Sequence, residues 1–365
     1  MPQLSEIIQH LEQLAPLSLQ ESYDNAGLIT GQPSMEVKGI LVCLDSTEEV
    51  MEEAIRNGCN VVVAHHPILF SGLKRLTGNH YTERVLIKAI RHDIAIYAIH
   101  TNLDNVLHGV NARFAAQLGL LHTRILSPMK GRLKKLVTFV PGAQLEAVRA
   151  ALFEAGGGHI GNYSECSFSS GGTGSFKGEA GSQPFAGVAG IRHLEAEERL
   201  ELIFPAWKEK DMLAALRGAH PYEEIAYDVY TLDNAFMSTG AGLYGELPEV
   251  MDGPAFLDFL KQKMNCAMIR HTKLLSGPIK KVAICGGSGS FLLQDAVRCG
   301  ADIFISSDFK YHQFFDADGR IVLADIGHFE SEQFTIDLLA EHLREKFTTF
   351  AVRLTETQTN PIYYR

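Results

Sequence analysis

The chain has 365 residues, of which 46% are hydrophobic and 21% charged, a globular composition in a chain longer than one core usually fills. Its formal net charge is −10 and it has no basic cluster, which argues against a nucleic-acid partner. The sequence has no long apolar run and no signal-peptide pattern, which argues against a membrane protein or a secreted one. The six cysteines lack C-x-x-C spacing. We therefore expect a cytoplasmic protein with reduced thiols.

The N-terminal elements predict a parallel α/β sheet. Apolar residues at helical spacing predict a helix over 4–14, and the polar segment 21–28 (ESYDNAGL) is predicted to be a surface turn. Residues 39–44 (GILVCL) and 61–64 (VVVA) predict buried strands, with a helix over 49–57 between them. Such a strand–helix–strand unit joins parallel strands through a right-handed crossover.

Polar side chains follow two of these strands where each strand ends. His65 and His66 come directly after the second strand, and their side chains point to opposite sides of an extended chain. The next predicted strand, 94–99, is followed by His100 and Asp104. Ligands bind at the carboxyl ends of strands in open α/β sheets, so these residues are candidates for a shared site.

The middle of the chain has a different pattern. Between residues 129 and 234 the predicted order is strand, helix, strand, strand, helix, strand, which is the ferredoxin-like plan. The second strand is predicted over 163–168 and the third over 199–204, with the Gly/Ser-rich segment 169–187 in the connection between them. The segment 220–224 (HPYEE) is interpreted as a loop with a packed tyrosine rather than a binding site. We therefore predict an inserted α+β domain.

The C-terminal part repeats the first part. Aligning residues 54–58 with 296–300 brings two strand–helix–strand units into step and places Ser307 and Asp308 where the first half has His65 and His66. The predicted domains are 1–128 (first half of the core), 129–234 (insert) and 235–365 (second half of the core). The glycine-rich turn 286–290 either cradles an anion or is a tight strand–helix connection.

Histidines and carboxylates at several strand ends are typical of a dinuclear metal site, in which a carboxylate bridges two ions. In the second half, His328 and Glu332 are separated by one helical turn and would share a face if a helix begins near Gly327. His100 is either a sixth ligand or a hydrogen-bond partner of a ligand or of bound water. The candidate metal ligands are His65, His66, Asp104, His328 and Glu332.

Five motifs in order resemble the Nif-three-like dinuclear metal family, whose members include GTP cyclohydrolase I type 2 homologs. They are YDNAGL (23–28), AHHPILF (64–70), HTNLDN (100–105), CGGSG (285–289) and GHFESE (327–332). Residues 129–234, with GNYSECSF and HPYEE, resemble the P-II/CutA-like insert of the longer bacterial members. One departure is Ser306-Ser307-Asp308, where many members have Thr-Gly-Asp.

The resemblance implies a duplicated three-layer α/β core and a homo-hexamer arranged as a trimer of dimers. It also implies two divalent metal ions per chain, zinc or iron, facing an internal cavity. Two functions follow as expectations. The first is a metal-dependent hydrolase acting on a nucleotide, such as GTP, through water activated by the metals, with His100 or Asp308 as general base. The second is a metal-binding regulatory or ligand-sensing ring without catalysis.

Overall fold

All 365 residues are described by a computed structural model, in which the chain divides into two compact units. The core unit comprises Met1–Pro128 and Met237–Arg365, and the insert unit comprises Met129–Phe236. No helix in the structure combines the length and apolarity needed to cross a membrane.

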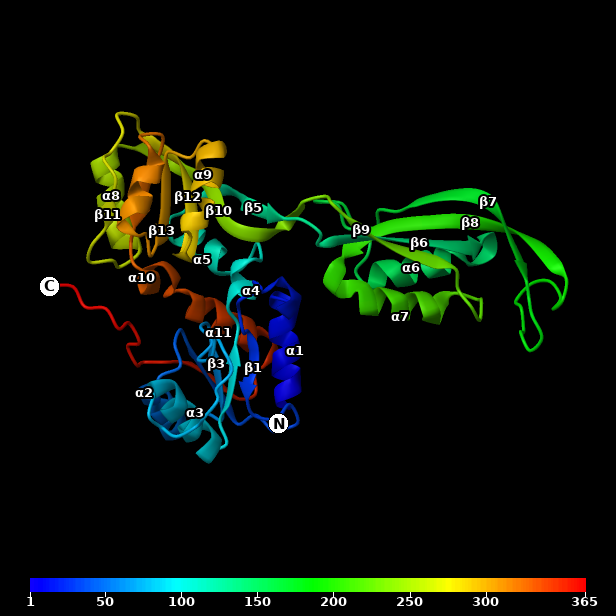
Figure 1. Cartoon of the computed structure of the whole chain (residues 1–365), viewed down its shortest axis with the longest axis horizontal. Helices are drawn as coiled ribbons and strands as arrows, with labels where there is room; N and C mark the ends of the chain where they lie inside the picture. Colours follow the sequence, from blue (N-terminus) through cyan, green and yellow to red (C-terminus); the bar gives the residue numbers. More distant parts are fainter. The chain divides into compact units, whose positions relative to one another are not determined.

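The first half of the core unit contains a five-stranded sheet in the order β1-β4-β3-β2-β15 (Figure 1). β2, β3 and β4 run parallel, as predicted, and every residue in them is buried. β1 pairs antiparallel with β4 at one edge, and β15 pairs parallel with β2 at the other. The strands are β1 (Gly27–Thr30), β2 (Gly39–Cys43), β3 (Val61–Ala64), β4 (Ala95–Ala98) and β15 (Ala351–Leu354).

Helices cover both faces of this sheet, which explains why its three central strands β2, β3 and β4 are apolar. On one face, α2 and α3 pack against β2, β3 and β4 through a buried cluster that includes Val50 and Val85. On the other face, α11 (Thr335–Lys346) packs against β2, and α1 packs against α11. The helices of the first half are α1 (Leu4–Leu14), α2 (Glu48–Arg56), α3 (Tyr81–Arg91), α4 (Thr101–Asp104) and α5 (Val110–Gln117), with a 3-10 turn at Leu17–Leu19.

The second half contains a six-stranded sheet in the order β11-β14-β13-β12-β10-β5. Its strands are β5 (Leu121–Met129), β10 (Phe236–Met251), β11 (Arg270–His271), β12 (Ile279–Ser288), β13 (Ile303–Ser307) and β14 (Val322–Asp325). Its helices are α8 (Gly253–Lys263), α9 (Leu293–Arg298), α10 (His328–Glu332) and α11 (Thr335–Lys346), with 3-10 helices at Ser290–Leu292 and Tyr311–Ala317.

The topology of the two halves confirms the duplication. In each half three parallel strands stand side by side, β2-β3-β4 and β12-β13-β14, and a short antiparallel strand, β1 or β11, pairs with the last of them. A short helix, α4 or α10, follows that last strand. The histidine strand β3 and its counterpart β13 therefore occupy equivalent places in the two sheets.

The insert unit has the ferredoxin-like fold. Its sheet has the order β7-β8-β6-β9 with antiparallel neighbours, and α6 and α7 cover one face (Figure 1). A buried cluster that includes Leu136, Leu152, Leu202 and Leu216 joins the helices to the sheet. The elements are β6 (Leu133–Pro141), α6 (Leu145–Glu154), β7 (Phe168–Lys177), β8 (Arg192–Pro205), α7 (Glu209–Ala219) and β9 (Tyr227–Leu232), with 3-10 turns at Gly142–Gln144 and Ala206–Lys208.

One strand of the insert lies later than predicted. β7 occupies Phe168–Lys177, within the Gly/Ser-rich segment assigned to a connection, and the predicted strand at 163–168 does not form. β8 also begins earlier than expected and pairs with β7 along the whole of β7. Because β7 is an edge strand, backbone hydrogen bonds to a single neighbour hold it, and glycine is tolerated there.

We predict that the core unit folds without the insert. The insert buries its own apolar cluster, and β5 and β10, which lead into and out of it, are neighbours in the core sheet. Replacing residues 129–234 with a short Gly/Ser linker should therefore give a monodisperse protein with one cooperative melting transition by circular dichroism. A core that aggregates or melts without cooperativity would show that the insert is required for folding.

Candidate metal centre

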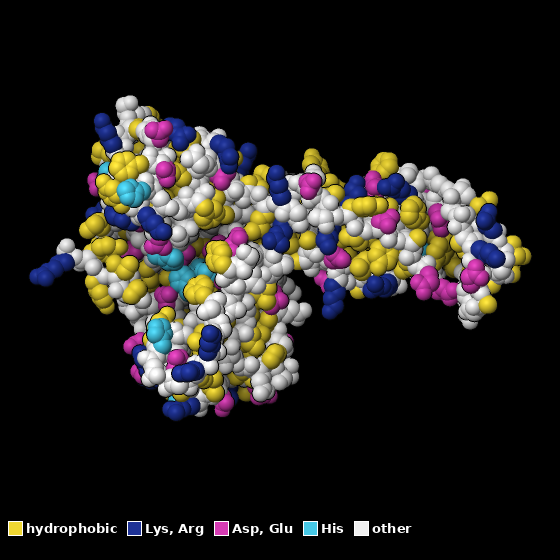
Figure 2. Space-filling view, in the orientation of Figure 1, with side chains coloured by type: hydrophobic (Ala, Val, Ile, Leu, Met, Phe, Trp, Pro, Cys, Tyr) yellow, Lys and Arg dark blue, Asp and Glu magenta, His cyan; other side chains and the backbone are white.

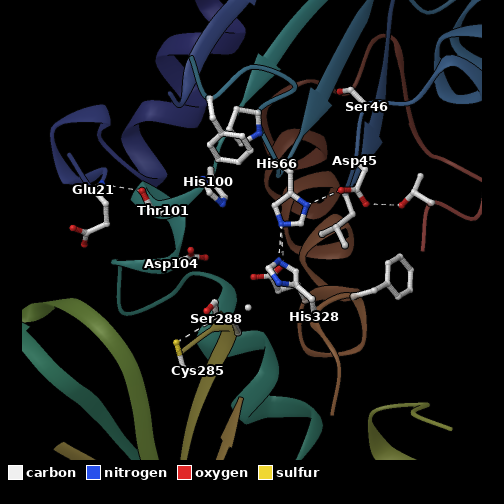
Figure 3. A pocket seen from close by; sticks show the side chains of 18 of the residues that line it. Glu21, Asp45, Ser46, His66, His100, Thr101, Asp104, Cys285, Ser288 and His328 are labelled. Atoms are coloured by element: carbon white, nitrogen blue, oxygen red, sulfur yellow. Dashed lines mark hydrogen bonds and ion pairs between the residues drawn. The ribbon is translucent and has the colours of Figure 1, made fainter. Parts of the chain in front are cut away.

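The carboxyl ends of the parallel strands of both halves face a cavity of about 610 Å³ in the core unit. Residues of both halves line it, among them His66, His100 and Asp104 from the first and His328 and Glu332 from the second. In Figure 2 histidine side chains gather in a hollow of this unit, and Figure 3 shows His66, His100, Asp104 and His328 around the cavity. The structure thus brings the candidate ligands of both halves together.

His65 is fully buried, and one of its two ring nitrogens makes a hydrogen bond to the backbone. Its Nδ1 donates to the carbonyl of Ile99 at 2.8 Å, which leaves the lone pair of Nε2 directed at two carboxylates. Nε2 lies 3.7 Å from Asp104 Oδ1 and 3.8 Å from Glu332 Oε1. His65 Nε2 and Asp104 Oδ1 are both buried without a hydrogen-bond partner. Buried polar atoms normally have one, so a proton or a metal ion between these two atoms would satisfy both.

A second set of donor atoms lies on the other side of Glu332. His66 Nε2 lies 3.0 Å and His328 Nε2 lies 3.1 Å from Glu332 Oε2, and the two nitrogens are 3.3 Å apart. His328 and Glu332 lie on one face of α10, which begins directly after Gly327, as predicted. Atoms bound to one zinc ion at roughly 2.0–2.2 Å are also separated by about 3–4 Å, so the spacing fits a metal site.

Each imidazole of this second set is held by a carboxylate behind it. His66 Nδ1 donates to Asp45 Oδ1 at 2.8 Å, and Asp45 Oδ2 accepts a hydrogen bond from Thr359 near the C-terminus. His328 Nδ1 donates to Asp308 Oδ2 at 2.6 Å. Histidines that bind metals commonly donate their other ring nitrogen to a carboxylate or a carbonyl, which fixes the tautomer and the direction of the lone pair.

Glu332 therefore contributes one oxygen to each of two groups of potential ligands. The first comprises His65, Asp104 and Glu332, and the second comprises His66, His328 and Glu332. Three protein ligands leave coordination positions open for water or substrate, which is typical of catalytic rather than structural zinc sites. The residues present therefore fit a divalent-metal centre in which Glu332 belongs to both groups.

The pKa values show the same demand for positive charge around Glu332. Burial would raise the pKa of Glu332, but the neighbouring histidines, His328 foremost, hold it well below its usual range. Burial would lower the pKa of His66 and of His328, but hydrogen bonds to carboxylates and the charge of Glu332 raise them to about 10 and about 11. Burial and the charge of Glu332 raise the pKa of Asp104 to about 7.

His100 lies beside the two donor sets. Its ring centroid is 5.4 Å from that of His65 and 5.4 Å from that of His66, and it lines the cavity. Its Nδ1 donates to Asp24 Oδ1 at 2.8 Å. Burial would raise the pKa of Asp24, but hydrogen bonds from His100 and Thr101 lower it to about 2. A third group of possible ligand atoms, His65, His66 and His100, keeps direct coordination by His100 open.

Asp308 lies where the duplication places it, directly after β13, but does not line the cavity. Its backbone is in the left-handed region with φ of 59°, a conformation that Asp adopts more readily than most residues. Its carboxylate contacts His328, so the structure places it behind a candidate ligand.

The glycine-rich segment 286–290, which spans the end of β12 and the start of the 3-10 helix after it, makes room for Glu332. A Cβ atom added to Gly287, whose φ is +62°, would lie 2.4 Å from Glu332 Oε1. The backbone N–H groups of Gly286 and Gly287 donate to Asn111 and Ser331, so these two groups are not available to an anion. Of the two interpretations of this turn, the tight connection is the one that the structure supports.

Two carboxylates of the site were not among the predicted residues. Asp24 was assigned to a surface turn, yet its side chain is fully buried against His100. Asp45 lies just before α2, whose N-cap is Thr47, and its carboxylate holds His66. The signal for Asp45 was its position at the end of the strand next to the histidine strand.

A family model described as Duf34/NIF3 (NGG1p interacting factor 3) matches residues 2–361. A Bacillus subtilis protein named "GTP cyclohydrolase 1 type 2 homolog" is 38% identical, covering 98% of each chain, and one of that name from Halalkalibacterium halodurans is 40% identical, covering 88% of this chain and 87% of its own. A solved Bacillus cereus protein related to NIF3 has 38% identity and a TM-score of 0.88, covering 100% of this chain and 99% of its own. Staphylococcus aureus protein SA1388 has 29% identity and a TM-score of 0.78 over the same shares.

We predict that Gly287→Ala reduces metal binding although it removes no ligand. The new methyl group would displace Glu332, and the left-handed backbone adds about 1–2 kcal/mol of strain. Elemental analysis of the purified variant should find clearly less metal than in wild type. Gly142→Ala is the control, because nothing lies within 4 Å of a Cβ atom there. Full metal content in Gly287→Ala would show that Glu332 is not confined as described.

We also predict that metal binding releases protons. At pH 7.5 the raised pKa values of about 10 and about 11 mean that the imidazoles of His66 and His328 are positively charged, with a proton on both ring nitrogens. A metal ion must displace the proton on Nε2 of each. Calorimetric titration of metal-free protein with Zn²⁺, in buffers of different ionisation enthalpy, should show release of about two protons. Affinity should fall as the pH is lowered. Binding without proton release would contradict the proposed ligand set.

Proposed function

The chain belongs to the Duf34/NIF3 family, and we propose that it is a metal-dependent hydrolase with a dinuclear centre of zinc or iron. The observation that carries the proposal is the pair of donor sets on either side of Glu332, both beside a cavity of ligand size. The proposed ligands are His65, Asp104 and Glu332 for one ion and His66, His328 and Glu332 for the other. When bound, the two ions supply Lewis acidity and a water molecule of lowered pKa.

The protein's own residues hold this centre rigid and supply a proton acceptor. Ile99, Asp45 and Asp308 fix the three imidazoles, so all three Nε2 atoms already point at the donor sets before a metal ion binds. His100 is the proposed general base, because Asp24 holds its Nδ1 and its ring lines the cavity 5.4 Å from the rings of His65 and His66. Asp308, the other expected base, has the role of orienting His328.

The lining of the cavity favours an aromatic heterocycle as the reacting part of the substrate. The rings of Phe70, Tyr81 and Phe291 line the cavity, and such rings stack on planar bases. No lysine or arginine is among the lining residues, so the positive charge that meets a phosphate group would come mainly from the metal ions. The name of the curated relatives suggests GTP, and the specific form of the proposal is hydrolytic opening of the guanine ring.

The second candidate is a metal-binding regulatory ring. The number of protein ligands on each metal ion distinguishes it from an enzyme. A purely structural or regulatory metal would be saturated by protein ligands, whereas each donor set here offers three atoms beside a cavity. Both candidates are compatible with the proposed homo-hexamer, a trimer of dimers, for which mass measurement in solution is the test. The enzyme is the candidate that the open cavity supports.

We predict that His100→Gln and Asp104→Asn separate catalysis from metal binding. His100→Gln should keep both metals and lower the rate of GTP ring opening, followed by loss of guanine absorbance, by about 10²–10⁴-fold. Asp104→Asn should lose metal, because its Oδ1 has no other partner.

The control is His271→Gln, an exposed histidine at the far edge of the second sheet, which should leave both metal content and rate unchanged. Metal loss in His100→Gln with retention in Asp104→Asn would place His100 among the ligands instead. A fully loaded wild type that does not consume GTP, guanosine or guanine would contradict the proposed reaction on the guanine ring.

A further inference from the structure

The insert unit contains a cavity of its own, about 700 Å³ in volume. It lies on the sheet face opposite α6 and α7. Leu200 points into the apolar cluster beneath those helices, so by strand alternation Glu197 and Arg199 point to the opposite face, where they line the cavity. Nothing in the proposed hydrolase uses this space, which lies wholly between residues 139 and 226.

Two loops and the glycine-rich strand β7 form the cavity. The connection between β7 and β8 (residues 178–191) joins the 220–224 loop through a hydrogen bond from the Gln183 N–H to Glu223 Oε1, at 2.9 Å. On β7, Gly172 and Gly174 stand opposite Glu197 and Glu195. A Cβ atom at Gly172 would meet only a carbonyl oxygen at 4.0 Å, so the space above Gly172 is open, whereas the Glu197 carboxylate occupies the space above Gly174. The glycines of β7 are therefore part of what creates the cavity.

Aromatic rings form one wall of the cavity. The ring centroid of Tyr222 lies 6.2 Å from that of Phe176 and 5.9 Å from that of Phe185. These rings do not close into a core, because Phe185 remains 54% exposed. The Tyr222 hydroxyl donates to Glu197 Oε1 at 2.8 Å. Burial, and to a lesser degree the Glu197 carboxylate, raises the pKa of Tyr222, so the phenol keeps its proton. Ring faces and a carboxylate thus stand side by side.

The charges in the lining favour a cation. Four carboxylates line the cavity against two basic side chains, Lys177 and Arg199, and Arg199 is paired with Glu201. These carboxylates do not converge on a metal-sized point, since every group of three or more potential ligand atoms within 4.8 Å lies in the core unit. Aromatic faces attract organic cations, and a nearby carboxylate adds a charged hydrogen-bond acceptor. The carboxylates lining the cavity are Glu179, Glu197, Glu223 and Glu224.

We infer that this cavity binds a small organic cation, an ammonium or guanidinium group carried on a short apolar chain. Glu197 accepts the charged group, while Tyr222 and Phe176 contact the chain and the face of the cation. A site in the insert that is separate from the metal centre gives the chain a second ligand. Because this cavity shares no residue with the metal centre, failure of the proposed hydrolase reaction would not affect this assignment.

The test is calorimetric titration of the full-length protein with agmatine, which carries a guanidinium at one end and an ammonium at the other. We expect saturable binding of one molecule per chain and none with 1,5-pentanediol, a neutral molecule of similar length. Glu197→Gln should weaken agmatine binding at least about tenfold, the equivalent of one lost charged contact.

Glu198→Gln is the matched control, since it makes the same change of charge one residue along β8, outside the lining of the cavity. It should leave agmatine affinity within about twofold of wild type. Gly172→Leu, which fills the cavity from an open position, should abolish binding while the insert stays folded by circular dichroism. No saturable binding, or equal losses in Glu197→Gln and Glu198→Gln, would overturn the assignment.

Discussion

The site depends on one buried carboxylate that faces three imidazoles. Glu332 is almost fully buried and directs one oxygen toward His65 and the other toward His66 and His328. A buried anion is costly unless a cation accompanies it, so this arrangement requires protons or metal ions between the donor atoms. Gly287 leaves the space that Glu332 occupies. The glycine-rich segment, the short helix α10 and the neighbouring strand ends all contact or surround the Glu332 side chain.

Duplication explains how such a constellation can be assembled from distant parts of the chain. Each half ends its central parallel strands at the same cavity and follows the last of them with a short helix, so Asp104 at the end of α4 corresponds to Glu332 at the end of α10. The halves differ after the middle strand, where His65 and His66 supply donors and Asp308 instead supports one. The proposed centre is therefore composite, and neither half contains all its ligands.

The sequence predicts the repeated parallel strands well, because buried strands are uniformly apolar. The residues that it marks as candidate ligands lie together in the structure, because polar residues at the ends of such strands stand out. It predicts less well what only tertiary packing decides. Asp24 is indistinguishable from a turn residue until the fold carries it to His100. The glycine-rich β7 lacks strand propensity and forms because β8 offers it a hydrogen-bonding edge. The cavity beside β7 exists partly because glycines of that strand have no side chains to fill it, and the sequence alone does not show that a cavity forms there.

The central claim is that two metal ions share Glu332. It is tested most directly by anomalous X-ray diffraction from crystals of zinc- or iron-loaded protein. The account predicts two anomalous peaks roughly 3.5–4 Å apart, one beside His65 and Asp104 and the other beside His66 and His328, with the Glu332 carboxylate between them. A single peak, or peaks away from Glu332, would contradict it.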